Sequence, residues 1–305
     1  MADTLFFGRK YELTVGESTW VSELGKPAMD IKFELSHAIG TLYKEGTISI
    51  LGLRKERMNS ILELAALDPG TARQRLLSVK LTAGYHSAAG TVDLFRGFVV
   101  YATITSPPNM WLNMKVSEIN PRSGTAINCN VSGEPTVTEL VETLIQRANA
   151  AGDAAPYGYE FVDHTVGQKC SSRRIANFMV GQAPLVDALG KLSEATGKFA
   201  TFLFRGLTIE AYDVCPEDRP PDDIITIDGD HGLLSVSGIS VTNARVTTFI
   251  QNRPTSLTWF NLDSKLNPQA NGKYQILREE FKGHFAGREW YMIYEGSAKK
   301  TLSGG

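Results

Sequence analysis

The sequence has few cysteines and no excess of basic residues. Its 305 residues include three cysteines, Cys129, Cys170 and Cys215, and no C-x-x-C pair. This excludes zinc-ribbon and thioredoxin-type motifs and fits a protein made in a reducing cytosol. With 31 basic and 33 acidic side chains, the formal net charge is −2. A dedicated nucleic-acid binder usually has a basic excess, and this chain has none.

Long apolar runs are also missing. No stretch of about 18 consecutive apolar residues occurs, so we expect no membrane contact through a spanning helix. The first residues carry charges at Asp3, Arg9, Lys10 and Glu12, unlike a signal peptide, and we expect synthesis in the cytoplasm. Hydrophobic residues make up 42% and charged residues 21%, which is typical of a globular chain of two or three domains.

The common catalytic and cofactor motifs are absent. The sequence contains no phosphate loop, no dinucleotide-binding glycine motif, no H-E-x-x-H and no G-x-S-x-G. Its five histidines are scattered singly. We therefore expect no catalytic residues, no cofactor and no metal site.

Three short segments nevertheless have enzyme-like residues. Asp228-Gly229-Asp230-His231 offers a carboxylate and an imidazole for acid–base chemistry or a metal, although a polar turn after a strand at 224–227 explains the same residues. Asp163-His164 is a weaker pair of the same kind. Ser297 and Lys300 match S-x-x-K without the partner motifs of that enzyme class.

Two further groups could bind ligands. The run from Cys170 to Arg174 could receive a phosphate or an acidic partner, or could be a solvated loop. Aromatic residues could stack on sugars or bases, but each lies in a predicted strand, where aromatic residues are enriched because they pack well, and this favours a core or subunit-interface role. These residues are Trp111, Trp259, Trp290 and Tyr291.

Hydrophobic periodicity predicts strands at both ends of the chain and helices in the middle. A capping box at Thr136 and Glu139 and an apolar stripe over 137–148 predict one helix. A second helix is predicted from Pro184 to Gly197, and a hairpin over 199–212 follows it. A Pro- and acid-rich stretch at 216–223 is typical of a linker, and 299–305 of a frayed tail. One helix is predicted within the first strands, at 54–66. Alternating segments that predict strands are 11–15, 31–35, 47–50, 79–83, 91–105, 110–119, 233–241, 244–250, 257–262, 274–285 and 289–294.

The C-terminal segment is the most distinctive part of the sequence. An "SKLNP…NG.Y" loop is followed by a strand pair that ends in "G.EWY", and near the N-terminus Leu81 to Tyr85 and Leu94 to Gly97 give "L.AGY…LF.G". With these motifs the chain resembles baseplate hub proteins of contractile-tailed bacteriophages and the matching part of type VI secretion spikes. The residues of the C-terminal motif are Ser264, Lys265, Leu266, Asn267, Pro268, Asn271, Gly272, Tyr274, Glu289, Trp290 and Tyr291.

The resemblance implies a mainly β fold with an α+β insert. Two tail-tube-type β-barrel domains, at 1–120 and 224–305, would flank a small α+β domain at 121–223. It also implies a non-enzymatic homotrimer in the virion that joins the six-fold tail tube to the three-fold central spike. Other baseplate proteins would bind around its rim, and DNA would pass through its lumen without specific binding.

Two alternatives remain open at this point. The chain could be a tail-tube or secretion-tube subunit with a decorating middle domain, which would form a hexamer with one tube barrel per chain. It could also be a tail-associated cell-wall hydrolase that uses Asp228, Asp230 and His231.

Overall fold

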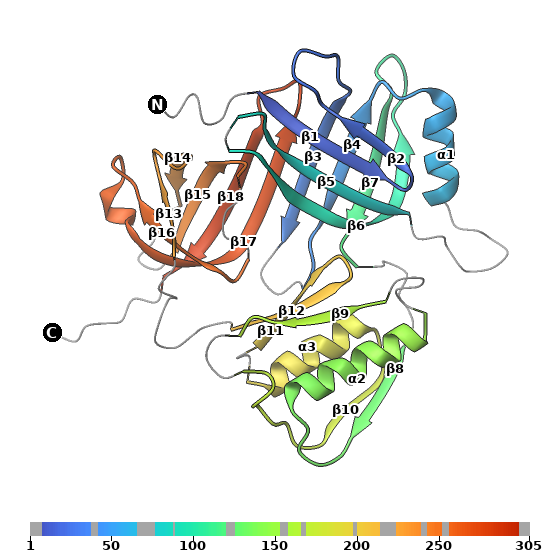
Figure 1. Ribbon diagram of the computed structural model, residues 1–305, viewed down its shortest axis with the longest axis vertical. Helices are drawn as coiled ribbons and strands as arrows, with labels where there is room; N and C mark the ends of the chain where they lie inside the picture. Colours follow the sequence, from blue (N-terminus) through green and yellow to red (C-terminus); the bar gives the residue numbers. More distant parts are fainter. Residues whose placement is uncertain are drawn as a thin grey trace.

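A long β-sheet and a smaller α+β unit make up the protein (Figure 1). The computed structural model describes residues 8–37, 42–65, 77–87, 89–119, 126–152, 158–165, 169–197, 200–213, 224–238, 243–251 and 256–298. Within these ranges no helix combines the length and apolar character that a membrane crossing requires. The predicted linker at 216–223, the tail at 299–305 and Cys215 lie outside the described residues.

The N-terminal part of the sheet confirms the alternation in the sequence. Tyr11, Leu13 and Val15 point into the core, and so do Ile31 and Leu35, because one face of each strand is buried and the other polar. The elements are β1 (Arg9–Val15), β2 (Ser18–Val21), β3 (Asp30–His37), β4 (Glu45–Leu51), α1 (Lys55–Ala65), β5 (Ser78–Tyr85), β6 (Thr91–Ile104) and β7 (Trp111–Ser117).

The C-terminal strands extend the same sheet. Strand β17 pairs antiparallel with β3, with Phe281 opposite Leu35 and Lys282 opposite Glu34, so both ends of the chain share one sheet and one hydrophobic core. The division at 120 and 224 stays a prediction. The C-terminal elements are β13 (Ile225–Asp228), β14 (Leu233–Ser237), β15 (Asn243–Phe249), β16 (Trp259–Asp263), the 3-10 helix η2 (Pro268–Ala270), β17 (Gly272–His284) and β18 (Trp290–Ser297).

The middle of the chain builds a separate α+β unit with its own core. Thr136 and Glu139 form the predicted capping box: the Glu139 N–H donates to the Thr136 hydroxyl, and the Glu139 carboxylate accepts from the Thr136 N–H. Pro184 is the N-cap of its helix rather than the first helical residue as predicted. The elements are β8 (Ile127–Val131), α2 (Val137–Ala150), β9 (Glu160–Asp163), β10 (Phe178–Ala183), α3 (Leu185–Ala195), β11 (Ala200–Arg205) and β12 (Thr208–Asp213).

Sequence periodicity missed four short strands, β2, β8, β9 and β10. Strands of four to six residues show too few alternations to stand out from a loop. Three of the four complete the small sheets of the α+β unit: β8 pairs with β10, and β9 lies parallel to β12. The fold is therefore mainly β with an α+β insert, as predicted.

Candidate functional site

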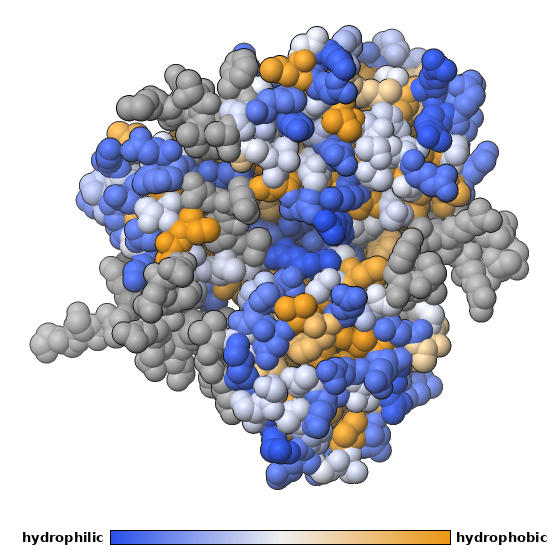
Figure 2. All heavy atoms as spheres, in the orientation of Figure 1, coloured by the Kyte–Doolittle hydropathy of each residue, from blue (hydrophilic) through white to orange (hydrophobic). Residues whose placement is uncertain are grey.

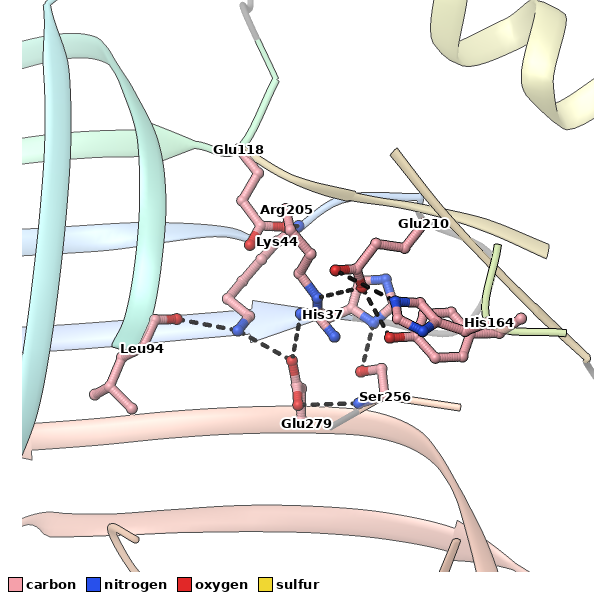
Figure 3. Close-up of polar contacts among 10 residues, drawn as sticks. His37, Lys44, Leu94, Glu118, His164, Arg205, Glu210, Ser256 and Glu279 are labelled. Atoms are coloured by element: carbon pink, nitrogen blue, oxygen red, sulfur yellow. Dashed lines mark hydrogen bonds and ion pairs between the residues drawn. The ribbon is translucent and has the colours of Figure 1, made fainter. Parts of the chain in front are cut away.

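A cluster of buried charges lies where the sheet meets the α+β unit. Its main residues are Lys44 just before β4, Glu118 just after β7, Arg205 at the end of β11 and Glu279 in β17. Figure 3 shows Lys44 and Arg205 directed at the Glu279 carboxylate. Figure 2 shows hydrophilic residues gathered over the same junction. The cluster therefore joins the N-terminal, middle and C-terminal segments of the chain.

Lys44 and Glu279 form the centre of the cluster. The Lys44 Nζ lies 3.0 Å from the Glu279 Oε1, and their side chains are 5% and 0% exposed. The Lys44 ammonium also donates to the Leu94 carbonyl at 3.0 Å and lies 4.3 Å from the centre of the Phe281 ring. The Lys44 backbone N–H donates to the Glu118 carboxylate at 2.7 Å. These contacts compensate for the removal of the lysine charge from water.

Arg205 carries the cluster into the α+β unit. Its Nη1 lies 3.3 Å from the Glu279 Oε1, and its Nε lies 3.6 Å from the Glu210 Oε2. Arg205 ends β11 at the tip of the β11–β12 hairpin, and Glu210 lies in β12. The pair with Glu210 therefore lies within the hairpin, and the pair with Glu279 holds the hairpin against β17.

A histidine and a serine complete the other side of Glu279. The His37 Nδ1 lies 2.7 Å from the Ser256 Oγ, and the Ser256 N–H donates to the Glu279 Oε2 at 3.2 Å. Both carboxylate oxygens of Glu279 are thus engaged.

The two fully buried carboxyl groups titrate in opposite directions. Burial by itself would raise the pKa of Glu279, but the positive charges of Lys44, Arg205 and His37 outweigh it and lower that pKa to about 2. Burial dominates at Glu118, whose pKa is raised in spite of the nearby Lys44 and Arg205 charges. Glu279 is therefore an anion under neutral conditions and supplies the charge that both cations need.

A cavity of about 600 Å³ borders this cluster and is lined by both charged and apolar residues. The described residues contain no group of three His, Cys, Asp or Glu side chains that could hold a metal ion. The paired charges hold the α+β unit against the sheet.

The sequence analysis missed this cluster. Its residues come from four distant segments, and within each segment the charged residue resembles any other charge in or beside a strand. The one local indication in the sequence is the adjacent pair Glu279 and Glu280: in a strand whose side chains alternate between two faces, one of two adjacent charges must point towards the buried face.

The C-terminal motif forms a tightly bonded loop between β16 and β17. The Ser264 N–H donates to the Asn271 Oδ1 at 2.7 Å, and the Asn267 N–H donates to the Ser264 Oγ at 3.1 Å. Pro268 begins η2, and the Tyr274 hydroxyl donates to the Ala270 carbonyl at 2.7 Å. The motif residues thus fix the loop conformation.

The last part of the motif meets the N-terminal motif. The Trp290 Nε1 donates to the Gly84 carbonyl at 3.1 Å, and the Tyr85 hydroxyl lies 3.5 Å from the Trp290 carbonyl oxygen. Trp290 is buried against Phe33 and Phe285, while Glu289 is exposed. The two distinctive segments of the sequence therefore pack together, although they lie near opposite ends of the chain.

The family model for baseplate hub gp41 matches residues 12–296, nearly the whole chain. The chain belongs to this baseplate hub family. It is accordingly a structural protein of the phage tail baseplate and a component of the virion. No curated protein sequence matches it.

Solved structures share the fold of this baseplate hub chain at very low identity. A tail protein from Neisseria meningitidis MC58 matches with a TM-score of 0.61 and 8% identity, over 96% of this chain and 97% of that one. The 43 kDa tail protein of prophage MuSo2 from Shewanella oneidensis matches with a TM-score of 0.58 and 8% identity, over 95% of this chain and 97% of that one. The E. coli c3393 protein matches with a TM-score of 0.58 and 12% identity, over 93% of this chain and 76% of that one. That protein is a type VI secretion component with structural similarity to T4 tail proteins gp27 and gp5.

The enzyme-like segments of the hub chain serve local structure. The Asp228 Oδ1 lies 2.7 Å from the His231 Nδ1 and accepts the His231 N–H at 2.8 Å, within a turn after β13 in which the His231 side chain is 57% exposed. The Asp163 carboxylate accepts from the Thr165 and Cys170 backbone N–H groups. Both aspartates stabilise turns.

The remaining candidates of the hub chain also have structural contacts. Arg173 and Arg174 donate to the carbonyls of Thr196 and Glu134, so both guanidinium groups hold neighbouring backbone. Ser297 ends β18, and Lys300 lies outside the described residues.

The aromatic candidates are spread over the sheet and form no common stacking platform. Trp111 lies under the Lys32 ammonium at 4.2 Å, and Trp259 is half-buried in β16. Tyr291 is half-buried in β18 beside Glu289, at 3.5 Å.

Proposed function

We propose that this baseplate hub chain forms a trimeric ring that connects a six-fold tail tube to a three-fold central spike. The observation that carries the proposal is the pairing of β17 with β3, which fuses the N-terminal and C-terminal strands into one sheet. Three chains, each with two β units in a fixed relation, offer six β units to a six-fold partner and three equivalent positions to a three-fold partner.

The buried charge cluster supports an adaptor of fixed shape. Arg205 and Lys44 both pair with Glu279, so the α+β unit is tied to the fused sheet at its centre. A rigid joint suits a protein that must hold the tube and the spike in one alignment while other baseplate proteins bind around the rim.

A hollow on the polar face of the sheet supports the channel-lining role. Its volume is about 610 Å³, and charged side chains from β3, β4, β7, β15 and β17 line it. Each cation there lies close to a carboxylate: Lys282 is 2.8 Å from Glu34, and Lys115 is 3.9 Å from Glu45. Paired cations hold phosphates weakly, so this face would let DNA slide past without specific binding.

The oligomeric state with its symmetry tests the proposal. We expect light scattering of the purified chain to give three times its 33.4 kDa mass, and electron microscopy to show a three-fold ring with six β units. A hexamer with one tube barrel per chain would instead favour a tube subunit. A stable monomer that joins neither tube nor spike would refute both assignments.

A further inference from the structure

The loop between β16 and β17 presents a leucine to solvent. Leu266 is 91% exposed, more than any other large apolar side chain in the described residues. Lys265 beside it and Lys273 at the start of β17 are also exposed, and neither forms an ion pair with any residue that the structure describes. The loop thus offers one apolar side chain between two free cations.

The backbone under Leu266 is already ordered. Ser264, Asn267 and Asn271 link the two sides of the loop by hydrogen bonds, and Ala270 is fully buried below it. A side chain held on such a fixed loop loses little conformational entropy when a partner covers it. An ordered loop that keeps a leucine in water is therefore suited to docking.

A complementary surface lies at the other end of the sheet, on the β1–β2 hairpin. Among the described strands β2 pairs with β1 alone, so its outer edge is open. Val21 on this strand is 43% exposed, and Leu24 just after it is 63% exposed. Glu12, which is opposite Val21, is an exposed carboxylate beside this apolar patch, and Glu17 is an exposed carboxylate in the turn at the start of β2.

The two surfaces match in chemistry but lie on opposite sides of the molecule. In Figure 1, β16 is on the left and β2 on the right, so the loop of one chain cannot reach the hairpin of the same chain. We propose that the Leu266 loop docks on the Val21–Leu24 patch of a second copy of this chain, with Lys265 and Lys273 facing Glu12 and Glu17. Such a head-to-tail contact uses different surfaces on each copy, and it generates a ring where the rotation between copies closes, as in the proposed trimer.

This inference rests on the proposed trimer and specifies its contact. The first test is Leu266→Asp, measured by sedimentation of the full chain over a concentration series. We expect the dissociation constant of the ring to rise by at least about tenfold, as for loss of an interface anchor. The matched control is Met179→Asp on β10, where an apolar side chain is 70% exposed outside both surfaces, and we expect no change.

A charge-reversal experiment identifies the partner surface. Lys265→Glu with Lys273→Glu in one chain weakens assembly, and adding Glu12→Lys with Glu17→Lys restores it at least in part. Because all four side chains are exposed, the thermal unfolding temperature stays as in the wild type. No rescue by the second pair would overturn the assignment of the β1–β2 hairpin.

The results separate this inference from the proposed function. A wild-type trimer together with a Leu266→Asp trimer of equal affinity overturns the loop contact and leaves the trimeric hub intact. A wild-type chain that remains monomeric at every concentration overturns both.

Discussion

Among the single residues, the unusual feature is a group of charged side chains that are buried away from solvent. A buried ion pair seldom stabilises a fold more than apolar residues would, but removal of one partner leaves an unpaired buried charge. Glu279 is the partner of both Lys44 and Arg205, and so the cluster depends on this one carboxylate.

We expect Glu279→Gln to destabilise the protein strongly. The amide nearly preserves the shape of the side chain but leaves Lys44 buried without its counter-charge, which costs about 3–5 kcal/mol of unfolding free energy. Urea denaturation measures the loss. The matched control is Glu34→Gln, whose 69% exposed side chain pairs with Lys282 at the surface and should change stability by about 0–1 kcal/mol.

The same variant should alter the response to acid. The pKa of Glu279 is about 2 in the folded protein and near 4.3 in an unfolded chain, so its contribution is present above about pH 4.3 and is lost as the pH falls towards 2. Glu118 acts in the opposite direction in the wild type, because burial and, to a smaller extent, the Glu279 charge raise its pKa. The wild type should therefore lose stability more steeply over this range than Glu279→Gln, and parallel curves would contradict the ion pairing.

At the scale of elements, strand β4 depends on a close approach to β3. A Cβ on Gly46 would lie 2.0 Å from the Glu34 carbonyl oxygen, a backbone atom that cannot move without shifting the strand. Strand β3 in turn pairs with β17, and so this contact lies next to the joint between the two halves of the sheet.

We expect Gly46→Ala to cost about 1–3 kcal/mol of unfolding free energy through overpacking. The matched control is Gly190→Ala in α3, where a Cβ meets nothing within 4 Å. Since alanine is the better helix former, this control should stabilise by about 0.5–1 kcal/mol. Thermal unfolding of the two variants should therefore shift in opposite directions. An unfolding temperature of Gly46→Ala at or above that of the wild type would contradict the close approach of β3 and β4.

At the scale of the whole molecule, the polar face of the fused sheet is balanced in charge. Glu34 and Glu45 neutralise lysines, and Glu295 neutralises Arg245 from the neighbouring strand. Direct cross-strand pairs of this kind stabilise the sheet only slightly when exposed. Their larger effect is to reduce the positive electrostatic potential that a polyanion such as DNA would encounter at this face.

If the proposed ring forms, we expect a triple change to Gln at Glu34, Glu45 and Glu295 to make it bind DNA. The change leaves Lys282 and Lys115 without a partner carboxylate, and Arg245 and Arg278 with Glu280 alone. Because three carboxylates are lost among these four cations, the slope of log K against log salt should steepen by about 2–3. Salt-dependent DNA binding of the ring measures it. Gln at Glu56, Glu63 and Glu142, which are exposed on α1 and α2, changes the net charge equally and should leave DNA binding much weaker. Equal binding by the two variants would argue against a channel role for the polar face.

Neighbouring residues in the sequence were enough to predict the longer helices and strands and the family of this protein. Alternation at Tyr11, Leu13 and Val15 and the capping box at Thr136 are properties of neighbouring residues, and the C-terminal motif lies within one short segment. The pairing of β17 with β3 and the contact of Lys44 with Glu279 became visible in the folded structure alone. Such contacts join segments far apart in the chain, and the partners leave no common period or spacing by which one could be found from the other.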